Sequence, residues 1–209
     1  INSNNTFKFF AKDIAGNSGS VTTSAYTIDT LAPVITLRGP TQVSAEVYSN
    51  YADAGATATD NRDGNVTSSI ITGGLPVNTS ILGTHPVTYN VSDQAGNTAT
   101  QVTRVVNVVD TTPPVITLLG SPTVTVQHGS TYSDAGATAT DNLDGNVTSS
   151  IIKSNPVNTS ILGTYPVTYN VSDQAGNAAT QVTRTVKVND TIAPTVSATP
   201  PGNLYNSIQ

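Results

Sequence analysis

The 209-residue sequence contains no cysteine, methionine or tryptophan, and only 10% of its residues are charged. Without cysteine the chain can form neither a disulfide nor a thiolate metal site, and cysteine usage gives no indication of its compartment. Eight Lys and Arg residues against thirteen Asp and Glu residues give a net charge of −5, which excludes the basic surface that nucleic-acid binding needs. No run of 18 apolar residues occurs, so we predict no membrane-spanning helix in this segment.

Catalytic motifs are missing as well. The chain has two histidines, His85 and His128, and neither has an acidic or nucleophilic neighbour that recurs elsewhere in the sequence. No GxSxG, HExxH, P-loop or dinucleotide-binding pattern is present. Asp60 and Asp63 could in principle act as a glycosidase pair, but aromatic residues, which line sugar clefts, make up only 5% of the chain. We therefore predict that the protein is not an enzyme.

What the sequence has in abundance is repetition. The segment 53–71 recurs at 134–152 with one change, Leu143 in place of Arg62. Self-similarity at a fixed period near 80 residues indicates an array of like domains. We predict four parts: the closing part of one β-sandwich at 1–28, complete repeats at 29–109 and 110–189, and the opening part of another sandwich at 190–209.

Within each repeat the apolar residues alternate with polar ones. Val87, Tyr89 and Val91 fall on one face of a strand and Thr88 falls on the other, which is the pattern of a half-buried strand. Gly, Pro, Asn and Asp clusters interrupt such runs every 8–12 residues, and no segment has helical periodicity. About seven short strands in 80 residues predict an all-β fold of tandem immunoglobulin-like antiparallel β-sandwiches, arranged end to end. Tyr89 and its counterpart Tyr169 are interpreted as core residues that bond their hydroxyls to the backbone.

Several motifs in order also indicate a family. The motifs DTxPPVITL, YxDAGATATDNxDGNVT and LGTxPVTYNVSDQAGNxATQVTR resemble the bacterial immunoglobulin-like repeat of surface and secreted proteins, a type that also occurs in pesticidal crystal proteins. The flanks, 1–28 and 190–209, are similar to parts of the chitobiase C-terminal-type sandwich, which accompanies carbohydrate-active enzymes and adhesins. The resemblance implies an extracellular, multi-domain protein whose role in this region is non-catalytic.

The phrase VSDQAGN occurs at Val91–Asn97 and at Val171–Asn177, and a looser copy, AKDIAGN, occurs at Ala11–Asn17. Between two strands such a phrase predicts a hairpin turn, in which Gly adopts positive φ and Asp caps the backbone. Turn formation alone is one complete explanation of these residues.

The second explanation is a calcium site. In a seven-stranded sandwich the last hairpin, the acidic loop 60–65 and the N-terminal linker lie at the same end, so carboxylates should converge there. Ca²⁺ takes six to eight oxygen ligands, although the spacing is not that of an EF-hand. The layout is similar to the linker calcium sites of cadherins and of the immunoglobulin-like repeats of giant bacterial adhesins. The predicted ligands are Asp29, Asp60, Asp63 and Asp93 in the first repeat and Asp110, Asp141, Asp144 and Asp173 in the second.

These features predict a structural spacer in a stalk, adhesin or filament, made rigid by calcium between domains. The alternative is a carbohydrate-binding accessory module of a secreted polysaccharide-active enzyme. The predicted partners are neighbouring domains, copies of the same protein joined by strand complementation through the incomplete ends, or a cell-surface glycan, and not nucleic acid. An excerpt of a longer array and a filament subunit both remain open as explanations of those ends.

Overall fold

A computed structural model describes residues 3–196 of the chain. The chain divides into two compact units at Thr111 and Thr112. The first unit contains a hairpin and the first repeat, and the second unit contains most of the second repeat. The opening part of another sandwich, which we predict at 190–209, lies largely outside the described residues.

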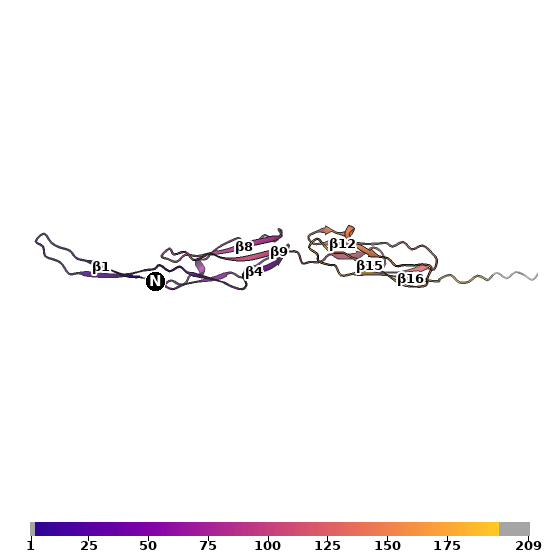
Figure 1. Cartoon of the computed structure of the whole chain (residues 1–209), viewed down its shortest axis with the longest axis horizontal. Helices are drawn as coiled ribbons and strands as arrows, with labels where there is room; N and C mark the ends of the chain where they lie inside the picture. Colours follow the sequence, from indigo (N-terminus) through magenta and orange to yellow (C-terminus); the bar gives the residue numbers. More distant parts are fainter. Residues whose placement is uncertain (1–2, 197–209) are drawn as a thin grey trace, which may run out of the picture. The chain divides into compact units, whose positions relative to one another are not determined.

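An antiparallel hairpin precedes the first repeat. Strand β1 (Ser3–Phe9) pairs with β2 (Thr22–Ile28) from the Ser3–Ile28 pair to the Phe9–Thr22 pair, and Figure 1 shows the two strands running together. No third strand joins this sheet among the described residues. Phe9 and Val21 are 59% and 57% exposed, so the hairpin leaves apolar surface uncovered.

The first repeat consists of seven strands in two sheets. One sheet has the order β3-β5-β6 and the other β4-β9-β8-β7, and Figure 1 shows β4, β8 and β9 side by side. The elements are β3 (Val34–Leu37), β4 (Gln42–Glu46), β5 (Ala56–Asp60), β6 (Gly64–Asn65), the 3₁₀ helix η1 (Thr67–Ser69), β7 (Ile71–Gly73), β8 (Gly83–Asn90) and β9 (Val102–Val109).

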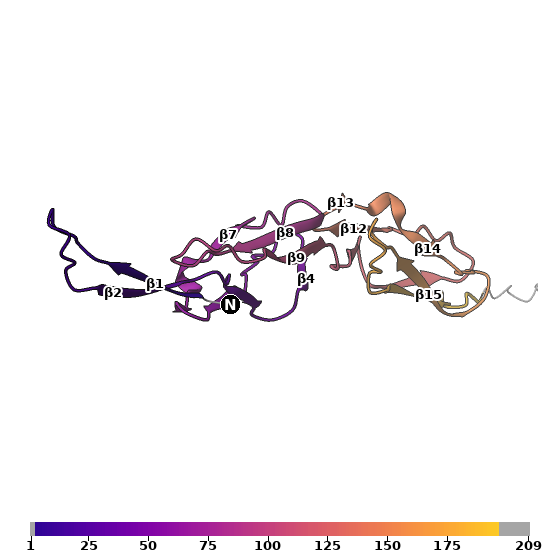
Figure 2. The same cartoon turned by 60° about the vertical axis from the view of Figure 1, so that its left-hand side comes forward.

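The second repeat has the same topology. Its sheets have the orders β10-β12-β13 and β11-β16-β15-β14, and Figure 2 shows β14 beside β15. The elements are β10 (Val115–Leu118), β11 (Thr123–Gln127), β12 (Ala137–Asp141), β13 (Gly145–Asn146), the 3₁₀ helix η2 (Thr148–Ser150), β14 (Ile152–Ser154), β15 (Gly163–Asn170) and β16 (Val182–Asn189).

The core of each repeat lies between its two sheets. In the first repeat, Ile35 and Ala58 of one sheet join a single buried cluster with Val87, Tyr89 and Val106 of the other. The alternation read in the sequence therefore selects the buried face correctly. An all-β, immunoglobulin-like sandwich is confirmed for each repeat.

One sheet departs from the expected antiparallel pairing. Strand β4 pairs with β9 in parallel, and β11 pairs with β16 in the same way. The first strand of the repeat is interrupted after Leu37, where Gly39 has φ of 80° and Pro40 lacks an amide donor. The chain crosses there from one sheet to the other. The second half of the interrupted strand, which is β4, therefore runs alongside β9, the final strand of the repeat.

A buried arginine ties the two sheets of each repeat together. Arg104 lies on β9 with 1% of its surface exposed, and its guanidinium donates to the Asp53 carboxylate and to the Tyr89 hydroxyl. Its remaining N–H groups donate to backbone carbonyls of the segments that flank β3 and β5. These acceptors are the carbonyl oxygens of Arg38, Pro40 and Gly55.

The tyrosine of this network is buried as predicted, but its expected bond to the backbone is wrong. The Tyr89 hydroxyl donates to Asp53, as does that of Tyr51. The Asp53 carboxylate accepts these hydrogen bonds because a buried carboxylate has to be paired with donors. The second repeat has the same arrangement, with Tyr169 and Arg184 donating to Asp134.

Burial by itself would raise the pKa of Asp53, but hydrogen bonds from Tyr89, Arg104 and Tyr51 outweigh it and lower that pKa to about 2. Burial and the adjacent carboxylate raise the pKa of Tyr89. The network therefore holds a charged Asp–Arg pair and a neutral tyrosine at neutral pH.

Candidate metal centre

Three aspartates from distant parts of the sequence meet at one end of the first repeat, which we call its pole. Asp29 follows β2, Asp60 ends β5, and Asp93 lies in the turn between β8 and β9. One carboxylate oxygen from each lies within 4.8 Å of the other two. Each of the three residues is 8% exposed. In the second repeat, oxygens of Asp110, Asp141 and Asp173 meet the same distance criterion.

Two of these carboxylates use one oxygen and leave the other unbonded. Asp60 Oδ1 accepts the backbone N–H groups of Arg62 at 2.8 Å and Asp63 at 2.9 Å, and these bonds hold the Asp60 pKa below its usual range. Asp29 Oδ1 accepts the N–H of Leu31 at 3.2 Å. The Oδ2 atoms of Asp29 and Asp60 are buried and accept no hydrogen bond from any described residue.

The third carboxylate is held by the repeated phrase. Asn97 donates its backbone N–H to Asp93 Oδ1 and its side-chain Nδ2 to Asp93 Oδ2, both at 2.7 Å. The same Nδ2 donates to the carbonyl oxygen of Asp29 at 3.3 Å. Gly96 has φ of 91°, as the predicted turn requires. The phrase therefore forms the turn and also aims Asp93 at Asp29, a role of Asn97 that turn propensity alone does not indicate.

The copy of the phrase at residues 11–17 separates these two roles. Asn17 donates to Asp13 Oδ1 at 2.8 Å and to Oδ2 at 2.9 Å, which reproduces the Asp93–Asn97 geometry. Asp13 is exposed, and among the described residues it belongs to no acidic cluster. The turn therefore forms without a second carboxylate nearby, so the burial of Asp93 against Asp29 and Asp60 needs a separate explanation.

The remaining predicted ligands, Asp63 and Asp144, lie near the clusters but outside them. Asp63 Oδ2 accepts the backbone N–H of Gln94 at 2.7 Å, and Asp144 Oδ2 accepts that of Gln174 at 2.7 Å. These bonds tie the acidic loop to the hairpin turn within each repeat. Asp63 also lines a cleft of about 240 Å³, together with Asp29, Arg62, Gln94 and Ala95.

The chemistry of the cluster fits a hard divalent cation. Buried carboxylates at this spacing repel one another unless a cation or protons neutralise them. The donors are carboxylate oxygens with the Asp29 carbonyl oxygen beside them, which suits Ca²⁺. No histidine or cysteine belongs to the cluster, so the donor set is a poor match for zinc.

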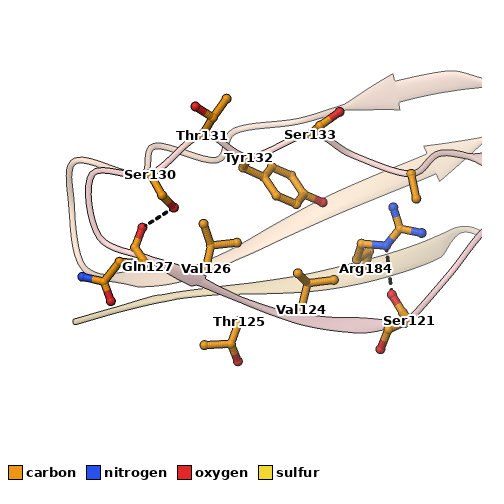
Figure 3. A pocket seen from close by; sticks show the side chains of 11 residues that line it. Ser121, Val124, Thr125, Val126, Gln127, Ser130, Thr131, Tyr132, Ser133 and Arg184 are labelled. Atoms are coloured by element: carbon orange, nitrogen blue, oxygen red, sulfur yellow. Dashed lines mark hydrogen bonds between the residues drawn. The ribbon is translucent and has the colours of Figure 1, made fainter. Parts of the chain in front are cut away.

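A second concave feature lies in the second repeat. A groove of about 360 Å³ runs beside β11, and Figure 3 shows Val124, Val126, Tyr132 and Arg184 around it. Three of the side chains around it are bonded within the protein: Ser130 Oγ donates to the Gln127 carbonyl, Arg184 Nε to that of Ser121, and the Tyr132 hydroxyl to Asp134. The lining of the groove combines apolar and polar side chains.

Comparison with known families places the chain. The family model described as bacterial surface protein, Ig-like domain, matches residues 35–108 and again residues 116–188. The chain belongs to this bacterial surface Ig-like family. The two matches coincide with the two sandwiches of the structure, and they confirm the family resemblance of the repeats.

The chain is also similar to parts of several longer proteins. The chain is 34% identical over 61% of its length to hyalin of Strongylocentrotus purpuratus, and 33% identical over 62% to the pesticidal crystal protein Cry22Aa of Bacillus thuringiensis. It is 30% identical over 78% of its length to the serine-rich adhesin for platelets of Staphylococcus aureus (strain MSSA476). The chain spans 11%, 18% and 8% of the lengths of these three relatives, respectively.

Membership of the surface Ig-like family supports an extracellular or cell-surface location and a non-enzymatic role. In the part of the chain that the structure describes, no helix is long and apolar enough to cross a membrane.

Proposed function

We propose that the chain is a non-catalytic spacer segment of a bacterial surface or secreted protein, of the stalk, adhesin or filament type, whose repeats are stabilised by Ca²⁺ at their poles. The family and the adhesin relative support the surface role. The observation that carries the calcium proposal is the pair of buried, unbonded Oδ2 atoms of Asp29 and Asp60 within the acidic cluster. A buried polar atom without a partner is costly, and a cation would satisfy both oxygens.

The calcium ion would be held in the first repeat by Asp29, Asp60 and Asp93, with Asn97 orienting Asp93. It would join the linker, the end of β5 and the last hairpin turn, three segments that the fold otherwise connects through few bonds. Such a cation would stabilise the repeat by neutralising the carboxylates, and it supplies no catalytic step.

The spacer role rests on repetition and on how the chain leaves each repeat. Near-identical domains add length without separate binding sites. After the last strand, Thr111 donates its backbone N–H at 3.0 Å and its hydroxyl at 2.5 Å to Glu46 Oε2. In the second repeat, the Thr191 N–H donates to Gln127 Oε1 at 2.6 Å. The second residue after the last strand is therefore fixed to the end of β4 or β11, which restricts the direction of the exit segment.

Two partner proposals accompany this function. The exposed edges of the β1–β2 hairpin suit strands of a neighbouring domain or of another copy of the protein. A cell-surface glycan is the partner if the segment acts instead as a carbohydrate-binding accessory module. A polysaccharide pull-down with robust binding would favour that rival function over the spacer.

Thermal unfolding in calcium and in chelator tests the calcium proposal. A ligand present at about 100 times its Kd stabilises the folded state by about 2.7 kcal/mol. For a domain of roughly 80 residues this corresponds to a rise of about 10–20 °C in melting temperature. Asp60→Asn keeps an acceptor for the two backbone N–H groups, so we expect it to remove the calcium response of the first repeat without unfolding it.

Asp13→Asn is the control, because it removes a carboxylate from a turn outside any described acidic cluster and should leave the calcium response intact. The Asp60→Asn variant should also melt no lower than the wild type in chelator, since it removes carboxylate repulsion. Identical melting curves in calcium and chelator would contradict the calcium proposal.

A further inference from the structure

The acidic loops of the two repeats differ in one side chain, which carries a charge in only one of them. The loop 60–65 reads DNRDGN and the loop 141–146 reads DNLDGN. We infer that Arg62 acts as a tethered competitor for the divalent cation, so that the first repeat binds Ca²⁺ more weakly than the second. This inference rests on the calcium site of the proposed function and adds a grading of the two sites.

The backbone of the two loops is held by the same bonds. Arg62 and Leu143 each donate their N–H at 2.8 Å to the aspartate two residues earlier. The next residue, Asp63 or Asp144, donates to the same oxygen at 2.9 Å in both repeats. Each of these two also accepts a backbone N–H of the hairpin turn at 2.7 Å. Because the two loops have the same backbone hydrogen bonds, we attribute a difference in calcium affinity between them to the side chain at position 62 or 143.

The side chain of Arg62 lies beside the acidic cluster. It lines one cleft with Asp29, Asp63 and Gln94, and Asp29 contributes one of the two buried, unbonded oxygens. That unbonded oxygen is an observation independent of the charge of the cluster, and it points to a missing ligand. The guanidinium, which is charged at all relevant pH values, therefore lies where it opposes the entry of a second cation.

The charge balance gives the direction and the size of the effect. The acidic cluster and loop carry a formal charge of −3 in the first repeat, with Arg62 included, and −4 in the second. With the dielectric constant of water, which suits an exposed guanidinium, a unit positive charge at about 8 Å from a divalent cation weakens binding by about 3- to 10-fold at low ionic strength. The difference should shrink as salt screens the interaction.

Calorimetric titration of the full 209-residue chain with CaCl₂ tests this inference. Asp141→Asn isolates the first site, and Asp60→Asn isolates the second. In the Asp141→Asn background, Arg62→Leu should tighten calcium binding by about 3- to 10-fold, whereas Arg62→Lys should keep the weaker affinity. In the Asp60→Asn background, Leu143→Arg should weaken binding by a similar factor.

Exchange of the two side chains thus interchanges the affinities if the inference holds. Calcium binding that stays within about 2-fold after both exchanges would overturn the inference and leave the calcium site intact. The absence of calcium binding in the unaltered chain would instead overturn the proposed function, on which the inference depends. Because Arg62 is exposed, its replacement should leave the melting temperature in chelator nearly unchanged.

Discussion

Replacing Arg104 with methionine should cost the first repeat most of its stability. The substitution keeps an unbranched apolar stem but removes the guanidinium, with its charge and its donors. Asp53 would stay buried without its cation, and three backbone carbonyls, those of Arg38, Pro40 and Gly55, would lose a donor. Removing one partner of a buried ion pair typically costs about 3–5 kcal/mol.

That cost is large compared with the stability of a small domain. Folded domains are stable by about 5–15 kcal/mol, and a repeat of about 80 residues belongs at the lower end of that range. At roughly 4–8 °C per kcal/mol, a loss of 3 kcal/mol lowers the melting temperature by at least about 12 °C. The network would thus provide the link between sheets that this cysteine-free sandwich cannot obtain from a disulfide.

Differential scanning calorimetry of the whole chain contains its own control. The first repeat should melt early in Arg104→Met while the second keeps its transition, and Arg184→Met should reverse the pattern. A double-mutant cycle with Asp53→Asn should show strong coupling, because the asparagine no longer needs the cation. A loss below about 1 kcal/mol in Arg104→Met would refute the view that this pair links the two sheets.

Two further outcomes are expected. Acid should destabilise each repeat: Asp53 and Asp134 have pKa values of about 2 when folded against 3.8 ordinarily, so their contribution is complete above pH 4 and is lost as the pH falls towards 2. Acid unfolding followed by circular dichroism should show this loss of stability, which is worth about 1–2 kcal/mol per repeat after allowance for solvent screening. Asp53→Asn should remove the pH-dependent loss in the first repeat. Asn97→Ala should weaken calcium binding in a titration, since Asp93 loses the side-chain donor to its Oδ2 and keeps only the backbone N–H, whereas Asn17→Ala should not.

The sequence predicts the sandwich and the meeting of Asp29, Asp60 and Asp93, because both follow from strand alternation and from the order of loops in a seven-stranded sandwich. It does not predict that β4 pairs in parallel with β9. Alternation identifies the buried face of a strand but not its neighbour in the sheet. The break at Gly39 and Pro40 is visible in the sequence, yet its consequence depends on which sheet receives the second half of the strand.

The arginine network could have been detected in part. Arg104 has the same parity as Val102, Val106 and Val108, which places a charge on the inward face of β9. Its partner Asp53 lies 51 residues earlier in a segment without regular structure, and only the packing of the two sheets brings them together. For Asp63 the sequence predicts too much. Its position in the acidic loop predicts a metal ligand, but in the fold one of its carboxylate oxygens accepts the backbone N–H of Gln94.

Crystals of the chain grown with calcium would test the central claim most directly. Anomalous scattering should show one peak at each pole, with the first about 2.3–2.6 Å from carboxylate oxygens of Asp29, Asp60 and Asp93. The peak in the first repeat should vanish in Asp60→Asn crystals while the peak in the second repeat remains. Well-ordered poles without any anomalous peak, at a calcium concentration in the millimolar range, would contradict the calcium site.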